Sequence, residues 1–343
     1  MERLTDEKAV FLLKNGDILT LGQQADKVRR QLHPGNIVTF IIDRNINYTN
    51  ICVNECNFCA FYRRPGDKGA YLLSMDDILQ KVQETVDAGG TQIMLQGGLH
   101  PDMGFDYYID MLTTIKKKFD ITIHSFTATE ILHFSKITGY SVTEVLKRLQ
   151  AAGLSSLPGG GAEILVDRVR RIVSPKKLMT ADWLNIMRCA HKIGMKTTAT
   201  MVLGLGETVE ERIEHMRKIR MLQDETGGFR AFIMWTFQPG HTKIGGEKLS
   251  SWEYLKTLAT ARLYFDNISH MQGSWVTQGK NIGQLTLAFG ADDLGSIMLE
   301  ENVVRAAGTS HHMSVNTMTD IIKKTGSIPA QRDTAYNIIR YCK

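Results

Sequence analysis

Cysteine and proline are scarce in this chain, which has five cysteines and seven prolines among 343 residues. The sequence also has no apolar run near the length of about 20 residues that a membrane-spanning helix needs. The opening residues, Met1 to Lys8, are charged from the second position on, unlike the apolar stretch of a secretory signal peptide. We therefore expect a cytoplasmic protein with free thiols in a reducing compartment and with no membrane partner.

A strong charge of either sign is also missing. The net charge of +5 is modest, and the basic runs Lys116–Lys118 and Lys176–Lys177 are short. Such runs more often form solvated helix ends than nucleic-acid patches, so we expect no nucleic-acid partner. With 43% hydrophobic residues, the chain can bury the core of one large α/β barrel or of two ordinary domains.

Apolar β-rich runs alternate with amphipathic helical stretches, a pattern typical of parallel βα architecture. Two helices are expected at about residues 5–14 and 17–32, ending at His33-Pro34-Gly35. Candidate strands follow at residues 37–42, 91–95, 121–125, 154–157, 196–203, 230–236, 268–273 and 285–289. This order predicts a TIM-type (β/α)8 barrel in a single domain, 1–343. Its parts are an N-terminal helical segment (1–35), a barrel core (36–300) and a helical C-terminal extension (301–343).

Three of the five cysteines lie in one short run, Cys52-x3-Cys56-x2-Cys59, with no fourth cysteine nearby. Iron–sulfur cubanes usually have four cysteine ligands, so three thiolates leave one iron open to an exchangeable ligand. A structural zinc site is the alternative, because zinc also accepts three thiolates and one imidazole, here from His100 or His124.

Glycines and polar residues follow the candidate strands. After the cysteine loop, these segments are residues 96–98, 127–130, 158–163, 204–208, 238–240, 275–279 and 290–293. In a (β/α)8 barrel the loops after the carboxyl ends of the strands build the active site. We therefore expect all of these segments to meet at one mouth of the barrel.

Four motifs together resemble the radical S-adenosylmethionine (SAM) enzymes of the futalosine route to menaquinone. They are the cysteine run, Gln96-Gly-Gly-Leu-His-Pro101, Leu157-Pro-Gly-Gly-Gly-Ala-Glu-Ile-Leu165 and Trp235-Thr-Phe-Gln-Pro239. The resemblance extends across nearly the whole chain. Within that group the cyclase branch is favoured by Ile172–Lys177, Leu222–Gly228 and Arg262–Asn267.

This resemblance implies a [4Fe-4S] cluster held by Cys52, Cys56 and Cys59, with SAM chelated to the open iron. It also implies that a radical derived from SAM removes hydrogen from C4′ of dehypoxanthine futalosine, and that the resulting carbon radical closes on the aryl ring. An electron donor such as flavodoxin or ferredoxin is implied as a partner. Aminofutalosine synthase and the deazaflavin synthase subunits are alternatives within the superfamily, and a non-catalytic iron–sulfur or zinc protein is the alternative outside it.

Roles for single residues follow from the same resemblance. The residues expected at SAM are Phe58, Tyr62, Gln96, Gly97, Gly98 and Glu163. For the glycines the alternative is a plain strand-ending turn. For Glu163 it is a carboxylate that favours a helix N-terminus, and for the two aromatic residues it is simple packing.

Substrate contacts are expected from residues placed at the predicted mouth, namely His124, Thr127, Gln238 and Asp292. Asp293 or Glu130 would accept the proton that leaves the cyclised intermediate, if burial raises its pKa. A surface cap is the alternative for Asp292, and a buried hydrogen-bonded carboxylate is the alternative for Glu130. Cys189 lies on an apolar helical face and is expected to pack as a small hydrophobe.

Overall fold

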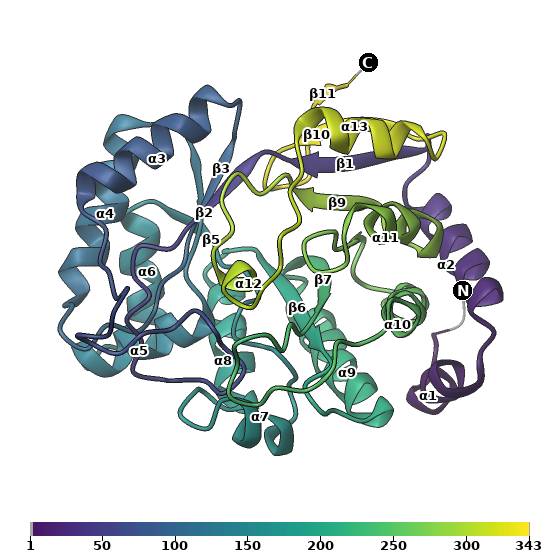
Figure 1. The fold of residues 1–343 in the computed structure, drawn as a ribbon, viewed down its shortest axis with the longest axis horizontal. Helices are drawn as coiled ribbons and strands as arrows, with labels where there is room; N and C mark the ends of the chain where they lie inside the picture. The colour runs from purple at the N-terminus through teal and green to yellow at the C-terminus, as the bar shows by residue number, and fades with distance from the viewer. Residues whose placement is uncertain (1–2, 343) are drawn as a thin grey trace.

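The computed structural model describes residues 3–342. Helices surround a central ring of strands, with α3 to α6 on one side and α2, α9 and α10 on the other (Figure 1). The N-terminal helices α1 (Asp6–Asn15) and α2 (Ile18–Leu32) confirm the expected pair. Their N-caps are Thr5 and Asp17, whose side chains accept hydrogen bonds from backbone amides in the first turn.

The ring begins with β1 (Ile37–Ile41) and β2 (Asp43–Ile46), which follow one another without a loop. The other ring strands are β3 (Gln92–Leu95), β4 (Thr122–His124), β5 (Leu154–Ser156), β6 (Thr197–Leu203), β7 (Phe229–Thr236), β8 (His270–Gln272) and β9 (Asp293–Ser296). Neighbours pair in parallel, the bridge between Leu157 and Thr197 joins β5 to β6, and β9 pairs with β1. The strands therefore close into the expected (β/α)8 barrel.

Helices follow the strands and cover the outside of the ring. They are α3 (Met75–Asp87), α4 (Phe105–Lys118), α5 (Ala128–Thr138), α6 (Val142–Ala151), α7 (Asp167–Val173), α8 (Thr180–Lys192), α9 (Val209–Thr226), α10 (Ser251–Tyr264) and α11 (Lys280–Leu285). None of the helices within residues 3–342 combines the length and apolar character needed to cross a membrane.

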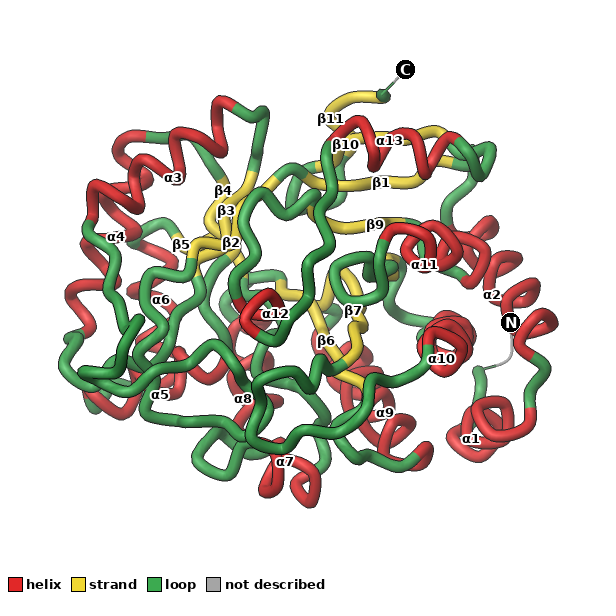
Figure 2. The backbone as a smooth tube through the Cα atoms, in the orientation of Figure 1, coloured by secondary structure: helices red, strands yellow, loops and turns green. Residues whose placement is uncertain are grey.

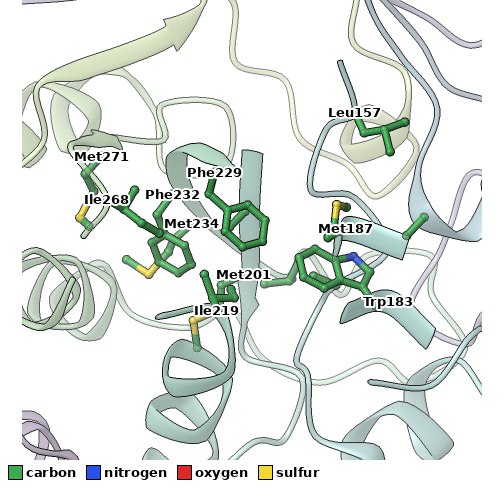
Figure 3. Packing of buried hydrophobic residues seen from close by; sticks show 14 of the residues in the cluster. Leu157, Trp183, Met187, Met201, Ile219, Phe229, Phe232, Met234, Ile268 and Met271 are labelled. Carbon is green, nitrogen blue, oxygen red and sulfur yellow. The ribbon is translucent and has the colours of Figure 1, made fainter. Parts of the chain in front are cut away.

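The core between the strands and the helices is apolar and rich in methionine. All seven residues of β6 are buried, as a strand covered on both faces requires. Figure 3 shows Met201 of β6 beside Met234 of β7, with Trp183 of α8 and Ile219 of α9 packed from the helical layer. Met187, Met201, Met234 and Met271 thus fill part of the core.

The expected strand at residues 285–289 is wrong. This segment holds the last residue of α11 and the 3-10 helix η1 (Thr286–Phe289), and the true ring strand, β9, begins at Asp293. A short apolar run cannot be assigned to helix or strand from periodicity alone. Here the aromatic ring of Phe289 packs against Gly22 of α2, where an added Cβ would lie 3.0 Å from the ring.

The segment after residue 300 is helical only in part, which corrects the expected helical extension. The short helix α12 (Val303–Ala306) and α13 (Val315–Lys323) are followed by strands β10 (Ile328–Arg332) and β11 (Ile338–Tyr341). β10 pairs in parallel with β1 on the side away from β9, and β11 runs antiparallel to β10. The C-terminal strands thus fill the space beside the amino end of the first barrel strand (Figures 1 and 2).

Candidate active site

The cysteine run lies in the long loop between β2 and α3, at the carboxyl end of the first barrel strand. The Cys52 amide donates to the Arg63 carbonyl, and the Cys59 amide donates to the Cys56 carbonyl in a tight turn. The Val53 amide donates to the Leu99 carbonyl, so the loop is also tied to the segment after β3. These bonds fold the loop back on itself and direct the three thiols to one place.

The three thiols lie near enough to one another to influence each other's pKa. Burial raises the pKa of Cys56 to about 12; the charge of Lys177 lowers it, and Glu163, Cys59 and Cys52 raise it further. Burial also raises the pKa of Cys59, although the amides of Tyr62 and Phe61 oppose this shift by donating to its sulfur. Buried thiols become thiolates only when a cation binds them, and three that converge beside an ammonium group fit a [4Fe-4S] cluster.

The histidines proposed for a zinc site have other partners. The Nδ1 atom of His100 accepts from the Asp102 amide, and Nδ1 of His124 lies 2.5 Å from Ser156 Oγ. Burial, with the charges of Arg230 and Arg332, lowers the pKa of His124 to about 3. His124 is therefore a neutral ring held within the barrel, and no hydrogen bond among residues 3–342 joins either histidine to the cysteine run.

The glycine segment after β3 packs directly against the cysteine loop. The Gly98 amide donates to the Thr49 carbonyl, and an added Cβ at Gly98 would lie 2.1 Å from the Ile51 carbonyl oxygen. At Gly97 an added Cβ would lie 2.4 Å from the ring of Tyr48. Glycine is required at these two positions because neighbouring atoms approach the backbone closely, and not because the φ angle is unusual. The Gln96–Gly98 segment therefore sets the position of the cysteine loop.

Glu130 supports the same segment from the first turn of α5. Its Oε1 atom accepts from the Tyr48 hydroxyl at 2.6 Å and from the Gly97 amide at 3.1 Å. Its Oε2 atom is buried and has no hydrogen-bond partner among residues 3–342. Burial raises the pKa of Glu130 to about 7, against the lowering effect of these hydrogen bonds. Glu130 is thus a buried hydrogen-bonded carboxyl group that titrates near neutrality.

The triple-glycine segment after β5 reaches the same mouth. An added Cβ at Gly160 would lie 2.8 Å from Thr127 Cγ2 and 3.4 Å from Gln96 Nε2, so the loops after three neighbouring strands meet there. Arg170 of α7 is fully buried and donates to the carbonyls of Gly161 and Leu178 at 2.9 and 2.7 Å. These hydrogen bonds hold the backbone carbonyls of the glycine-rich segment in place.

Glu163 connects the triple-glycine segment to the thiols. Its Oε1 atom lies 2.7 Å from Lys177 Nζ, and Oε2 lies 3.5 Å from Arg170 Nη1. The Lys177 ammonium is 5.4 Å from the ring centre of Phe58 and lowers the pKa of Cys56. Glu163 has a left-handed φ of 38°, which costs energy for a residue with a side chain. Through Lys177, Glu163 therefore lies near Phe58 and Cys56 of the cysteine run, and contact of Glu163 and Phe58 with SAM stays a prediction.

Lys177 and Arg170 contact the candidate site, and neither residue was predicted from the sequence. Lys177 lies in the segment Ile172–Lys177, which carries part of the family resemblance. That resemblance is the sequence feature that could have identified Lys177. Arg170 gave no local signal, because its partners are backbone carbonyls that sequence spacing does not reveal.

Other expected residues occupy the mouth as well. The Thr127 side chain caps α5 by accepting from the Glu130 amide. Gln238 is buried after β7 and donates from Nε2 to Thr236 Oγ1 at 3.2 Å. Tyr62 lies beneath the Lys243 ammonium, 5.2 Å from its ring centre.

Asp292 and Asp293 do not follow a strand, and the expectation that they lie at the mouth is wrong. They stand at the start of β9, because the eighth strand was predicted too early in the chain. Asp292 contacts Arg262 Nη2 at 2.5 Å and His270 Nδ1 at 2.7 Å, at the amino end of β8. The hydrogen bond from His270 and the charge of Arg262 hold the pKa of Asp292 at about 2, although burial alone would raise it.

Asp293 lies inside the barrel, at the level of Thr39 in β1. Its carboxylate accepts from Thr39 Oγ1 at 2.6 Å and from Arg332 Nε and Nη2 at 2.6 and 3.0 Å. The carboxyl end of that first strand is Ile46, so Asp293 lies well below the mouth.

The segment around α12 covers part of the mouth. Asn302 Nδ2 donates to Asn47 Oδ1 at 3.2 Å, and Thr309 Oγ1 donates to Gln238 Oε1 at 3.4 Å. In Figure 2 the loop that carries α12 lies in front of the strands. This cover was not predicted from the sequence.

Comparisons with known proteins give a family context for this geometry. Residues 46–219 match the model of the Radical SAM superfamily, and residues 226–343 match that of the CofH/MqnC C-terminal region. The chain is 50% identical over 339 residues to the cyclic dehypoxanthine futalosine synthase of Streptomyces coelicolor, covering 97% of this chain and 85% of that protein. It is 40% identical over 348 residues to the aminodeoxyfutalosine synthase of Thermus thermophilus, covering 99% and 93%.

Among solved structures, methylornithine synthase superposes with a TM-score of 0.76 at 20% identity, covering 96% of this chain and 94% of that one. At that identity the likeness concerns the fold alone, and it agrees with the barrel described above.

Proposed function

Because this chain belongs to the radical SAM superfamily, we propose that it converts dehypoxanthine futalosine into cyclic dehypoxanthine futalosine. One observation carries this proposal: identity over nearly the whole chain is 50% to a cyclase of this kind and 40% to a synthase. The reaction belongs to menaquinone biosynthesis by the futalosine route, and we place it in the cytoplasm.

The cysteine loop would hold a [4Fe-4S] cluster through Cys52, Cys56 and Cys59, which leaves one iron for the amino and carboxylate groups of SAM. Together these groups supply a 5′-deoxyadenosyl radical able to remove hydrogen from an unactivated carbon, while the protein binds and orients the reactants. The Lys177 ammonium offsets part of the negative charge of the thiolates, since it is buried beside Cys56.

We propose that SAM binds between the segments that meet around the thiols of Cys52, Cys56 and Cys59. Carbonyl oxygens of Gln96 and Gly97 would accept from the SAM amine, because glycine leaves the backbone open. Glu163 would accept from SAM, since its ion pairs with Lys177 and Arg170 hold the side chain in place beside the cysteine loop. Phe58 and Tyr62 would flank the adenine.

The substrate needs positioning more than activation, because its sugar and its aryl ring belong to one molecule. We assign its polar contacts to His124, Thr127 and Gln238. One hydrogen atom would pass from C4′ to the 5′-deoxyadenosyl radical, which becomes 5′-deoxyadenosine, and a carbon–carbon bond would form. To restore the aryl ring, one electron would then pass to a one-electron acceptor, for which an oxidised iron–sulfur cluster is suited, and one proton would leave to a base. Glu130 is the proposed proton acceptor, because a carboxyl group with a pKa of about 7 can accept a proton at neutral pH.

The proposal is tested by following deuterium from C4′ of the substrate and the adenosyl carbon of SAM into the products. The enzyme, reconstituted without oxygen and reduced with dithionite, is given SAM and dehypoxanthine futalosine deuterated at C4′. We expect one singly deuterated 5′-deoxyadenosine for each cyclised product, by mass spectrometry. Incorporation of adenosyl carbon from SAM into the main product would instead assign the chain to the synthase branch.

A further inference from the structure

Two imidazoles and a carboxylate meet at the amino end of the barrel, on the face opposite to the mouth. His33 caps the end of α2, His270 begins β8, and Asp292 directly precedes β9. Asp292 Oδ2 lies 2.7 Å from His270 Nδ1 and 3.4 Å from His33 Nε2. All three atoms lie within 4.8 Å of one another. Two imidazole nitrogens and one carboxylate oxygen form a donor set that suits divalent transition metals and zinc.

The Asp292 carboxylate divides its two oxygens between separate partners. Oδ1 accepts from the fully buried Arg262 guanidinium at 2.5 Å and from the Met271 amide at 2.7 Å, so the barrel holds this side chain in place. Within residues 3–342, the polar partners of Oδ2 are the two imidazoles alone. Carboxylates that bind metals are commonly fixed by such outer hydrogen bonds. Oδ2 is therefore the oxygen that a cation between the rings would contact.

Both imidazoles can turn a nitrogen lone pair toward a cation. Burial lowers the pKa of His33, so this ring is neutral at pH 7. His33 Nε2 lies 2.8 Å from the Ser269 carbonyl oxygen, which also accepts from Arg262 Nη1 at 2.8 Å and so keeps a partner if the ring turns away. The side chains of His33 and His270 are 18% and 23% exposed, which leaves a path from solvent.

A tyrosine with a strained backbone covers one of the two rings. Tyr336 lies in the turn between β10 and β11 and has a left-handed φ of 69°. Its ring stacks on His270 with centroids 3.8 Å apart and an interplanar angle of 15°, and the Arg332 guanidinium lies 3.8 Å from the same tyrosine ring centre. Backbone strain of this kind persists only where the surroundings impose it, often beside ligand sites. The position of His270 is thus set by the C-terminal turn.

The distances are near those of a tetrahedral zinc site. With zinc–ligand bonds of about 2.0–2.1 Å, neighbouring ligand atoms lie about 3.3 Å apart. The pair of His33 and Asp292 already has this spacing, whereas His270 Nδ1 would move about 0.6 Å away from Asp292 Oδ2 to reach it. The two imidazoles, whose centroids are 4.8 Å apart, would also tilt. Side-chain rotation supplies both changes without a shift of the barrel.

We propose that His33, His270 and Asp292 bind a zinc ion, with water as the fourth ligand. The C-terminal position of His33 on α2 favours this cation, because the helix dipole is negative there. The Arg262 charge opposes it, so we expect zinc that exchanges with solution. The ion ties the end of α2 to the starts of β8 and β9. The amino end of such a barrel serves stability and not catalysis, so this inference does not depend on the proposed function.

The experiment measures zinc in the untagged enzyme with its iron–sulfur cluster reconstituted without oxygen. The protein is dialysed to equilibrium against a series of buffered Zn²⁺ concentrations and analysed for zinc and iron. Zinc K-edge X-ray absorption then identifies the ligands. We expect one zinc per chain with nitrogen and oxygen ligands at about 2.0–2.1 Å and no sulfur at about 2.3 Å. Sulfur ligands would place the zinc on cysteine, and they would overturn the proposal, as would a protein that binds no zinc.

Two single variants test the ligands, His33→Gln and His270→Gln. Each should lower zinc affinity at least about 100-fold, because loss of a ligand should exceed the 10–100-fold cost of losing an outer partner. Both side chains are partly exposed, so the fold should persist, and circular dichroism and iron content verify this. If one variant loses its fold, the other decides. Wild-type affinity in a folded variant would disprove the assignment of that histidine.

A matched control removes two imidazoles outside this cluster, in the double variant His311→Gln, His312→Gln. Both of these side chains are exposed. Zinc affinity and the X-ray absorption spectrum should be the same as in the wild type. Loss of zinc from the control would assign the ion to surface histidines and would also overturn the proposal.

Discussion

Lys177 and Glu163 form a buried ion pair, with Nζ 2.7 Å from Oε1, directly beside the thiol of Cys56. Burial alone would lower the pKa of Lys177, but the charges of Glu163 and Cys56 raise it above its ordinary value. The side chain therefore stays an ammonium group in the folded protein. This pair links the segment after α7 to the triple-glycine segment.

Substitution of Lys177 by methionine should destabilise the protein by about 3 kcal/mol, because loss of one partner leaves a buried charge poorly paired. Urea unfolding measures this change. The matched control is Lys176→Met, which alters the exposed neighbour and should change stability by less than about 0.5 kcal/mol. Similar effects of the two substitutions would contradict the role of the buried pair.

Each of the substitutions Cys52→Ala, Cys56→Ala and Cys59→Ala should abolish iron incorporation and deoxyadenosine formation, because each removes one of only three protein ligands. Cys189→Ala should retain both at a cost of about 1 kcal/mol for a small apolar group. Iron content and product analysis report the result, and an active Cys56→Ala enzyme would disprove the ligand assignment.

Gly98→Ala should displace the cysteine loop, since the new Cβ would lie 2.1 Å from the Ile51 carbonyl oxygen and 2.8 Å from Cys52 Cβ. We expect a strong loss of SAM-induced change in the cluster spectrum. Gly104→Ala is the control, because an added Cβ there meets nothing within 4 Å and the φ angle is −74°. An unaltered spectrum in Gly98→Ala would show that the contact is not needed.

The pKa of Glu130 predicts a pH dependence of stability. Its folded-state pKa of about 7 exceeds the unfolded value of about 4.3, so protonation favours the folded state. The stabilising effect is complete below about pH 4.3 and is lost as pH rises through 7. Relative to wild type, Glu130→Gln should therefore gain about 3 kcal/mol in stability between pH 4.5 and 8. Urea titrations at both pH values test this, and parallel pH profiles of the two proteins would refute it.

The sequence predicted those parts of the site that depend on local spacing. The cysteine run and the glycines after β3 and β5 are recognisable because a cluster and a close backbone approach restrict neighbouring positions. Glu163 was proposed for the same reason, since it follows the three glycines and Ala162. Its partner Lys177 lies 14 residues further along, across α7, and no local pattern connects the two.

The errors have a common physical cause, which is that they concern long-range packing. The run 285–289 is apolar enough for a strand, but Phe289 packs on α2 and η1 forms instead. Because the eighth ring strand begins later in the chain than predicted, Asp292 and Asp293 lie at the start of β9 and not at the mouth. The strands β10 and β11 were missed because β10 is stabilised by pairing with the distant β1.

The pairing of β10 with β1 sets an order of events during synthesis of the chain. Ile37 is opposite Ile328, so β1 leaves the ribosome about 290 residues before this partner exists. At bacterial and eukaryotic elongation rates this delay lasts about 15 to 60 seconds. Throughout it one edge of β1 has unpaired amides and carbonyls, and an open strand edge invites aggregation. The nascent barrel therefore keeps an unpaired strand edge until β10 has been synthesised.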